Sequence, residues 1–291
     1  MIGICGVIYI DPTQSHNESP LTSNPCEIMR DNTKLQYLKY ALVSSLLLIA
    51  TFTLAPARAD QRDDFLAGRT RDCRRCDLAG LNFKRRDLSG ADLTGANLRD
   101  TNFHDAKLVG ARLAGADLTA ANLNKANLSR TEMGGAILRG AMLYAANLDA
   151  ANLGEADLSG ARMGTARLTR SKLSKAVLRD ADLRKARLAE AIMPGADLSG
   201  AALDFAFLRG AQLDGAALRE TRLTGAELIN ASLVGADLSD ANALGTNFRG
   251  ADLSRAVLAG TNLRRANLHE IKLDGAVFRA TAMPDGSTRD E

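Results

Sequence analysis

The chain has 291 residues, a formal net charge of +3, 46% hydrophobic residues and 4% aromatic residues, with no tryptophan. Its three histidines and the absence of a GxxxxGKS/T phosphate loop leave few of the groups that most enzyme sites use. So few aromatic residues also disfavour a surface that stacks nucleic-acid bases. We therefore expect no enzyme, no catalytic or metal site, no cofactor and no nucleic-acid partner.

Residues 1–28 fit neither a targeting signal nor the regular pattern that follows. Met29 would give a more ordinary start to the chain. We interpret 1–28 as an unstructured stretch or as a mis-called start of translation.

Residues 29–59 are typical of a signal peptide. Three basic residues precede an apolar stretch at 41–54, which is shorter than the about 20 apolar residues that span a membrane. Ala57 and Ala59 are the small residues that a signal peptidase requires, so we predict cleavage between Ala59 and Asp60. This predicts an exported, periplasmic protein, with an uncleaved inner-membrane anchor as the alternative.

Residues 60–75 are polar and charged, with Phe65 and Leu66 as the apolar pair. We expect an N-terminal cap here, a short helix or turn over the first unit of the repeat that follows. Such a cap would cover apolar side chains and free backbone groups at the end of a repeat array.

Cys73 and Cys76 are the cysteines that would remain after cleavage. In an exported protein a pair of cysteines favours a structural disulfide, which would fasten the end of the repeat array. Unpaired inward thiols, a CxxC redox accessory and half of a metal site are the alternatives. The βαβ context of a thioredoxin-like pair is missing.

From Cys76 to Met283 the chain repeats every five residues without insertion or deletion. The central residue of each pentad is usually Leu, and the residue two positions earlier is usually Ala or another small residue. A period of five fits neither an amphipathic helix nor an alternating strand, whereas a solenoid accommodates it. We expect four pentads to form one square coil, with the central and small residues inside. The exceptions at the centre are Phe83, Phe103, Phe248, Phe278, Met133, Met163, Met193, Met283 and Ala243.

The pentads ADLTG and ANLRD at 91–100, ADLSG at 156–160 and ADLSR at 251–255 match the consensus A(D/N)LxX. The chain therefore resembles the pentapeptide-repeat family over about 208 residues. The resemblance implies an all-β fold, a right-handed quadrilateral β-helix of about ten coils over 76–283. Some members of this family imitate DNA and modulate a type II topoisomerase, which is the alternative function. The slightly basic charge and the signal peptide argue against it, because DNA imitation needs a strongly acidic surface.

A second period, eight pentads long, overlies the first. It superposes Arg99, Arg139, Arg179 and Arg219, and likewise Ile137, Val177, Ala217 and Val257. We call these positions the eight-pentad stripe. Either an ancestral two-coil unit was duplicated, or the stripe docks a partner.

Basic residues gather near the middle of the repeat, nine against three acidic residues between Ala161 and Glu190. We call eight of the nine the basic girdle. It is either a solvated surface or an attraction for anionic lipid headgroups, envelope polymers or an acidic protein. Phe207, an outward aromatic nearby, could anchor such a partner. The predicted girdle residues are Arg162, Arg167, Lys172, Lys175, Arg179, Arg184, Lys185 and Arg187.

Ala243 interrupts the inner column of large residues, and Leu244 follows it one position late. We expect either an internal void at Ala243 or a bulge that turns Leu244 inward. Pro284 ends the register, and we expect 284–291 to be a disordered tail. A homodimer through an end coil is a further expectation.

The sequence thus predicts a non-catalytic structural and binding rod of the bacterial cell envelope. Its expected partner is a protein or an anionic envelope component.

Overall fold

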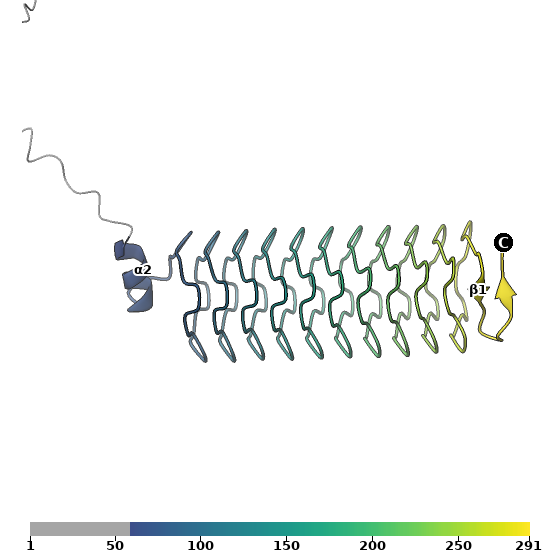
Figure 1. The fold of residues 1–291 in the computed structure, drawn as a ribbon, viewed down its shortest axis with the longest axis horizontal. Coiled ribbons are helices and arrows are strands. Elements are labelled where there is room, and N and C mark those ends of the chain that lie inside the picture. Colours follow the sequence, from purple (N-terminus) through teal and green to yellow (C-terminus); the bar gives the residue numbers. More distant parts are fainter. Residues whose placement is uncertain (1–58) are drawn as a thin grey trace, which may run out of the picture. The chain divides into compact units, whose positions relative to one another are not determined.

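The computed structural model describes residues 59–291 (Figure 1). The expectations for 1–28 and for the signal peptide, apart from Ala59, lie outside the described residues. The described residues 59–291 belong to one compact unit.

Parallel backbone pairing joins residues four pentads apart, from Asp72 with Asp92 to Asn262 with Ala282. Backbone hydrogen bonds run in both directions between neighbouring coils. The Leu98 N–H donates to the Asp117 carbonyl of the next coil at 2.7 Å, and the Asn97 N–H donates to the Cys76 carbonyl of the preceding coil at 2.9 Å. The pairing confirms the predicted coil of four pentads. Figure 1 shows the coils stacked side by side along one axis.

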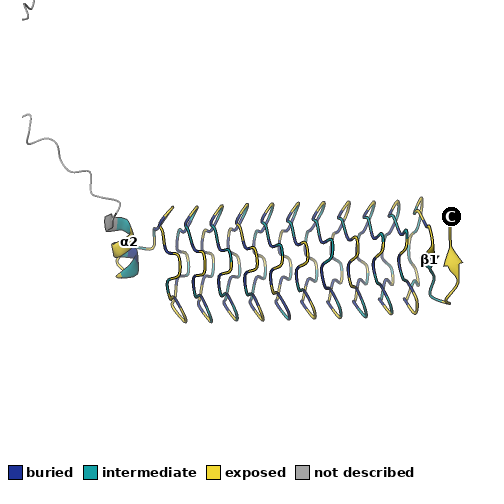
Figure 2. Ribbon diagram, viewed as in Figure 1, coloured by how far each residue is buried: buried dark blue, intermediate teal, exposed yellow. Residues whose placement is uncertain are grey.

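We name the four sides after their first central residues: the Leu78, Phe83, Leu88 and Leu93 sides. Along each side, between the two ends of the rod, the central residue and the small residue two positions before it are buried, and most residues at the other three positions are at least partly exposed (Figure 2). The residue two positions after the centre turns the corner with positive φ, whether it is Gly90 at 68° or Phe205 at 58°. Glycine meets this demand without strain, and the other residues adopt it at a cost.

The core is a continuous column of large and small apolar side chains. Phe83 and Phe103 stack inside it, with ring centroids 5.4 Å apart. Where a threonine replaces the small residue, its hydroxyl finds a backbone acceptor, as Thr101 does with the Leu78 carbonyl at 3.0 Å. Burial of a hydroxyl therefore leaves no unmet hydrogen bond at this position.

The expected bulge at Ala243 is wrong. Ala243 is fully buried, Leu244 stays at its outward position, and the Ala243 N–H donates to the Asn262 carbonyl at 2.9 Å. A shift of the chain by one residue at Ala243 would break the backbone hydrogen bonds to the coils on both sides, so the five-residue register is kept at this position. The next central residue of the same coil is Phe248, which is also fully buried and larger than leucine.

The N-terminal end is closed by helix α2, Ala59–Leu66. Phe65 enters the core and contacts the Phe83 ring edge to face, with centroids 6.0 Å apart. The Gln61 amide donates to the Asp72 carboxylate at 3.0 Å, and the Arg62 guanidinium donates to the Asp77 carbonyl at 2.8 Å.

The C-terminal end is closed by a hairpin, so the expected disordered tail is wrong. Strand β1, Thr281–Ala282, pairs antiparallel with β2, Thr288–Arg289. The turn at 284–287 closes because the Met283 N–H donates to the Ser287 carbonyl at 2.8 Å. The proline ends the β-helix register, and the chain folds back onto the last coil.

Candidate binding surface

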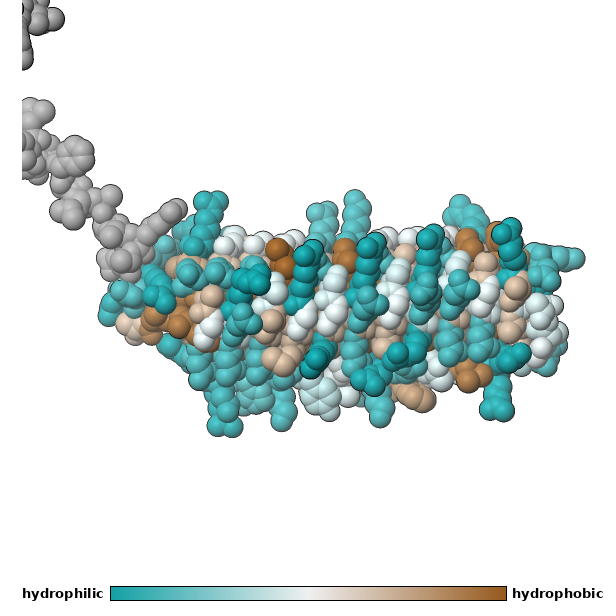
Figure 3. Space-filling view, viewed as in Figure 1, coloured by the Kyte–Doolittle hydropathy of each residue, from teal (hydrophilic) through white to brown (hydrophobic). Residues whose placement is uncertain are grey.

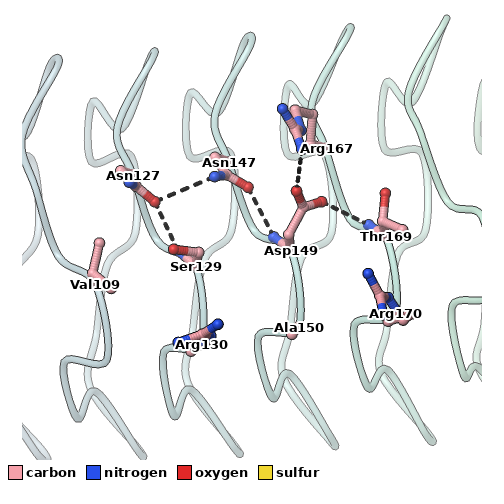
Figure 4. A pocket seen from close by; sticks show the side chains of 10 residues that line it. All are labelled: Val109, Asn127, Ser129, Arg130, Asn147, Asp149, Ala150, Arg167, Thr169 and Arg170. Carbon is pink, nitrogen blue, oxygen red and sulfur yellow. Dashed lines mark hydrogen bonds and ion pairs between the residues drawn. The ribbon is translucent and has the colours of Figure 1, made fainter.

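A shallow groove of about 560 Å³ lies on the Leu88 side, in the N-terminal half of the rod (Figure 4). It crosses four successive coils. Its lining is mainly polar, and it carries three arginines and one carboxylate. The lining residues are Val109, Asn127, Ser129, Arg130, Asn147, Asp149, Ala150, Arg167, Thr169 and Arg170.

The floor of the groove is fixed by one carboxylate, that of Asp149. It accepts from the Arg167 guanidinium at 2.5 Å and from the Thr169 N–H at 3.0 Å. The Asp149 N–H in turn donates to the Asn147 side chain at 3.0 Å. Figure 4 shows this chain of contacts running along the coils. Because Asp149 and Arg167 neutralise each other, the floor is polar and close to uncharged.

The open edge of the groove is a row of corner residues. Arg130, Ala150 and Arg170 occupy equivalent corners of three successive coils, all with positive φ. Ala150 leaves a gap between two arginines that stand roughly 10 Å apart along the rod, from two β spacings of about 4.8 Å. Among residues 59–291 neither arginine forms an ion pair. Two free guanidiniums beside a polar floor favour a phosphate, sulfate or carboxylate ligand.

The basic girdle surrounds the rod rather than covering one side. Its members lie on all four sides, because they belong to pentads whose central residues lie on all four sides. Three of them are engaged within the described chain: Arg167 with Asp149, Arg179 with Asp197, and Arg184 with Asp182. The girdle members that form no ion pair within residues 59–291 are Arg162, Lys172, Lys175, Lys185 and Arg187.

The arginines of the eight-pentad stripe, on the Leu78 side, form ion pairs with carboxylates of the same rod. Arg139 contacts Asp157 of the next coil, and equivalent pairs recur at each two-coil step, with Arg99 and Asp117 at 3.1 Å. Partial burial raises the pKa of Asp157, but hydrogen bonds from Ser159 and Arg139 outweigh it, and the pKa lies below its ordinary value. The arginines of the stripe are thus engaged with their own rod. Figure 3 shows hydrophobic side chains on the drawn face as isolated spots among hydrophilic ones.

Cys73 and Cys76 are buried at the first coil and stand as a disulfide, with Cα atoms 5.3 Å apart. A redox accessory needs sulfur atoms that a partner protein can reach, and the burial of Cys73 and Cys76 at this corner disfavours that access. Ala59 and Asp60, the predicted cleavage residues, are the first two residues of α2.

Within residues 59–291 no three histidine, cysteine or acidic side chains come together in a way that could hold a metal ion. The helix in the described part of the chain is too short to cross a membrane.

The repeat matches the family model of pentapeptide repeats in eight copies, from residues 76–115 to residues 244–279. The chain belongs to the pentapeptide repeat family. A comparison with curated proteins found no match.

Among solved structures, the chain is similar to HetL, a pentapeptide repeat protein involved in regulation of heterocyst differentiation in the cyanobacterium Nostoc sp. strain PCC 7120. The two are 35% identical with a TM-score of 0.63, and the match covers 78% of this chain and 97% of HetL. QnrB1, a plasmid-mediated fluoroquinolone resistance protein, is 20% identical over 70% of this chain and 91% of its own, with a TM-score of 0.42. A pentapeptide repeat protein of the Arabidopsis thaliana thylakoid lumen is 27% identical over 48% of this chain and 68% of its own, with a TM-score of 0.18.

Two features of this surface escaped the sequence analysis. The groove arises because a small corner residue, Ala150, stands one coil away from an arginine on either side. Phe205, a second outward aromatic close to Phe207, was likewise missed. Aligning the chain coil by coil would have shown both.

Proposed function

We propose that this pentapeptide repeat protein is an exported, non-catalytic rod of the bacterial cell envelope that binds an anionic partner through its Leu88 side. We extend the proposal to a right-handed rod of about ten coils and to a chain that begins at Asp60 after export. The signal-like residues 29–59 support the export. A disulfide between Cys73 and Cys76 suits the same oxidising compartment.

The observation that carries the binding proposal is the pair of unengaged arginines across the groove. On the Leu78 side, arginines such as Arg139 and Arg219 meet a carboxylate of the next coil, so their charge is satisfied within the protein. Arg130 and Arg170 line the groove on either side of Ala150 instead. Their positive charge is therefore free for an external anion.

Titration with polyphosphate by calorimetry tests the groove. Changing Arg130→Gln together with Arg170→Gln removes both guanidiniums from the edge while keeping two long polar side chains. We expect affinity to fall at least tenfold. The matched control is Arg255→Gln with Arg265→Gln, two corner arginines that also lack an ion pair within the described residues but do not line this groove. Equal losses in the two double variants would show that the groove has no special role.

Mass analysis of periplasmic and cytoplasmic fractions, with and without reductant and alkylation, tests the location. A periplasmic chain that begins at Asp60 and carries the disulfide is the expected result. A full-length cytosolic chain with free thiols would overturn the export proposal. It would also restore the topoisomerase alternative to consideration.

A further inference from the structure

Two exposed aromatic side chains flank one corner of the rod. Phe205 turns the corner between the Phe83 and Leu88 sides, and Phe207 is the first outward residue of the Leu88 side. They are 54% and 41% exposed. Among residues 59–291 the other exposed large hydrophobic side chains are Ile137, Tyr144 and Val277, and each lies at least seven residues from the others.

Phe205 faces outward, and its backbone adopts a conformation that is unfavourable for a bulky residue. Its φ is 58°, a conformation that bulky residues rarely adopt and that glycine adopts freely. Its ring lies against the next coil, where a Cβ at Gly225 would come within 2.8 Å of the ring. Glycine or a polar residue occupies many other corners, so nothing in the fold requires an aromatic residue here.

Free cations lie beside the aromatic pair on its own coil and on the preceding one, while Glu227 of the next coil pairs with Phe207. Lys185 precedes Phe205 at the same corner, Arg187 pairs with Phe207 from the preceding coil, and Arg209 follows Phe207 on the same side. None of these three forms an ion pair within residues 59–291, and all are exposed. Across this corner the ranges 161–170, 182–190 and 202–210 hold seven basic residues and three acidic ones.

We propose that this corner, with Phe205 and Phe207 at its centre, docks on the surface of an anionic phospholipid bilayer. Aromatic rings favour the region between headgroups and acyl chains, and nearby cations are attracted to anionic headgroups. The proposal rests on the proposed function and names its partner.

A lipid surface fits this corner better than an acidic protein does. A stable protein interface buries about 800 Å² on each partner around a closely packed apolar centre. This corner is convex and offers two rings surrounded by charge. A fluid headgroup layer adapts to a convex contact, so two rings and several cations suffice for weak, reversible binding.

The chain contains no tryptophan, so a single introduced indole reports on its own surroundings. Phe207→Trp places the probe in the corner. Tyr144→Trp is the matched control, because Tyr144 is 54% exposed and lies outside the corner. The full chain is mixed with vesicles of phosphatidylcholine that carry phosphatidylglycerol as the minor lipid, and with vesicles of phosphatidylcholine alone. Because the readout is local, binding through another part of the chain does not imitate it.

We expect the emission of the Phe207→Trp chain to shift to the blue, and to be quenched by brominated lipid, with anionic vesicles only. Raising the salt concentration reverses the shift. Replacing Lys185, Arg187 and Arg209 with Gln lowers vesicle partitioning by about fivefold for each cation. The Tyr144→Trp emission stays unchanged.

Phe205→Gly separates the docking role from folding. The change removes a ring and relaxes the corner backbone, so the fold persists while partitioning falls. No spectral shift of the Phe207→Trp chain with anionic vesicles at low salt overturns the proposal. A shift with soluble polyglutamate but not with vesicles also overturns it, in favour of an acidic polypeptide. The purified protein is used throughout, so these outcomes do not depend on the location of the chain in the cell.

Discussion

The apolar core of the rod is closed by different structures at its two ends. At the N-terminal end, α2 covers the first coil, Phe65 fills its centre and a disulfide joins Cys73 to Cys76. At the C-terminal end, the chain folds back on itself, and β2 pairs with β1. Large side chains that are only partly buried occur at both ends, Leu66 and Leu81 at the first and Leu268, Ile271 and Leu273 at the second. The N-terminal end is thus closed by buried side chains, and the C-terminal end mainly by backbone pairing.

This difference predicts where the rod opens. Each coil of a solenoid contacts only its neighbours, so local losses stay local. Amide hydrogen exchange along the chain reports such opening residue by residue. We expect the C-terminal coils to exchange faster than the N-terminal coils in the unmodified protein.

The largest expected effect comes from Phe65→Ala. It removes a nearly fully buried ring and its edge-to-face contact with Phe83, which typically costs about 3–5 kcal/mol. We expect fast exchange of the amides of the first two coils and little change beyond them. Phe278→Ala is the matched control, because both rings are 3% exposed, and it is expected to release the C-terminal coils instead. Opening that spreads along the whole rod in either variant would contradict nearest-neighbour coupling.

A smaller loss is expected from replacing Cys73 and Cys76 with serine. Closing a loop of this short length contributes about 2 kcal/mol through the unfolded chain. The exchange of the first coil is expected to quicken while the β1–β2 hairpin is unaffected. Adding reductant to the unmodified chain provides the comparison, since it opens the same bond without changing the sequence. If both treatments leave the first coil protected, α2 alone holds this end.

Most of the fold could be predicted because the pentad pattern specifies it at every position. A central leucine, a small residue two positions earlier and an outward polar residue between them leave one arrangement in which all large side chains are inside. The same redundancy explains why Ala243 does not disturb the register, since its neighbours on both sides hold the backbone.

The ends and the surface were harder to predict because each depends on a few side chains. Nothing in 284–291 resembles a strand by composition, yet pairing with β1 forms one. The Arg–Asp ladder was visible as a period of eight pentads, but the partner of each arginine lies in the next coil, as Asp117 does for Arg99. The coil geometry had to be known before that pairing could be seen.

At the C-terminal end, Arg289→Ala tests one side-chain contact of the hairpin. The Arg289 guanidinium lies 3.9 Å from the centre of the Phe278 ring, and such a contact contributes about 0.5–1 kcal/mol at an exposed site. We expect faster exchange at Thr281 and Ala282, the two residues of β1. Arg279→Ala, another exposed arginine of the last coil, serves as the control and is expected to change little. Equal effects of the two changes would indicate that general charge, rather than the ring contact, holds β2.

The smallest expected effect appears in acid, at one carboxylate near each end. Hydrogen bonds from the Arg74 side chain lower the pKa of Asp72, and those from Ser287 lower the pKa of Asp285, both from an ordinary value of 3.8. A carboxylate with a lowered folded pKa stabilises the folded chain above its unfolded pKa and loses that contribution as the pH falls through the folded pKa. The stability of both ends should therefore not change between pH 7 and 5, and it should fall below about pH 4.

The amide resonances of Arg74 and Ser287 measure this titration directly, because each N–H donates to the carboxylate in question. We expect both resonances to titrate with midpoints below 3.8, the ordinary value. Asp72→Asn should abolish the first titration and leave the second intact, because the two carboxylates lie at opposite ends of the rod. Asp72 also accepts from Gln61 of α2, so its protonation loosens the helix, whereas Asp285 holds only the turn before β2. A midpoint at or above 3.8 at either end would show that the carboxylate there does not stabilise its closure.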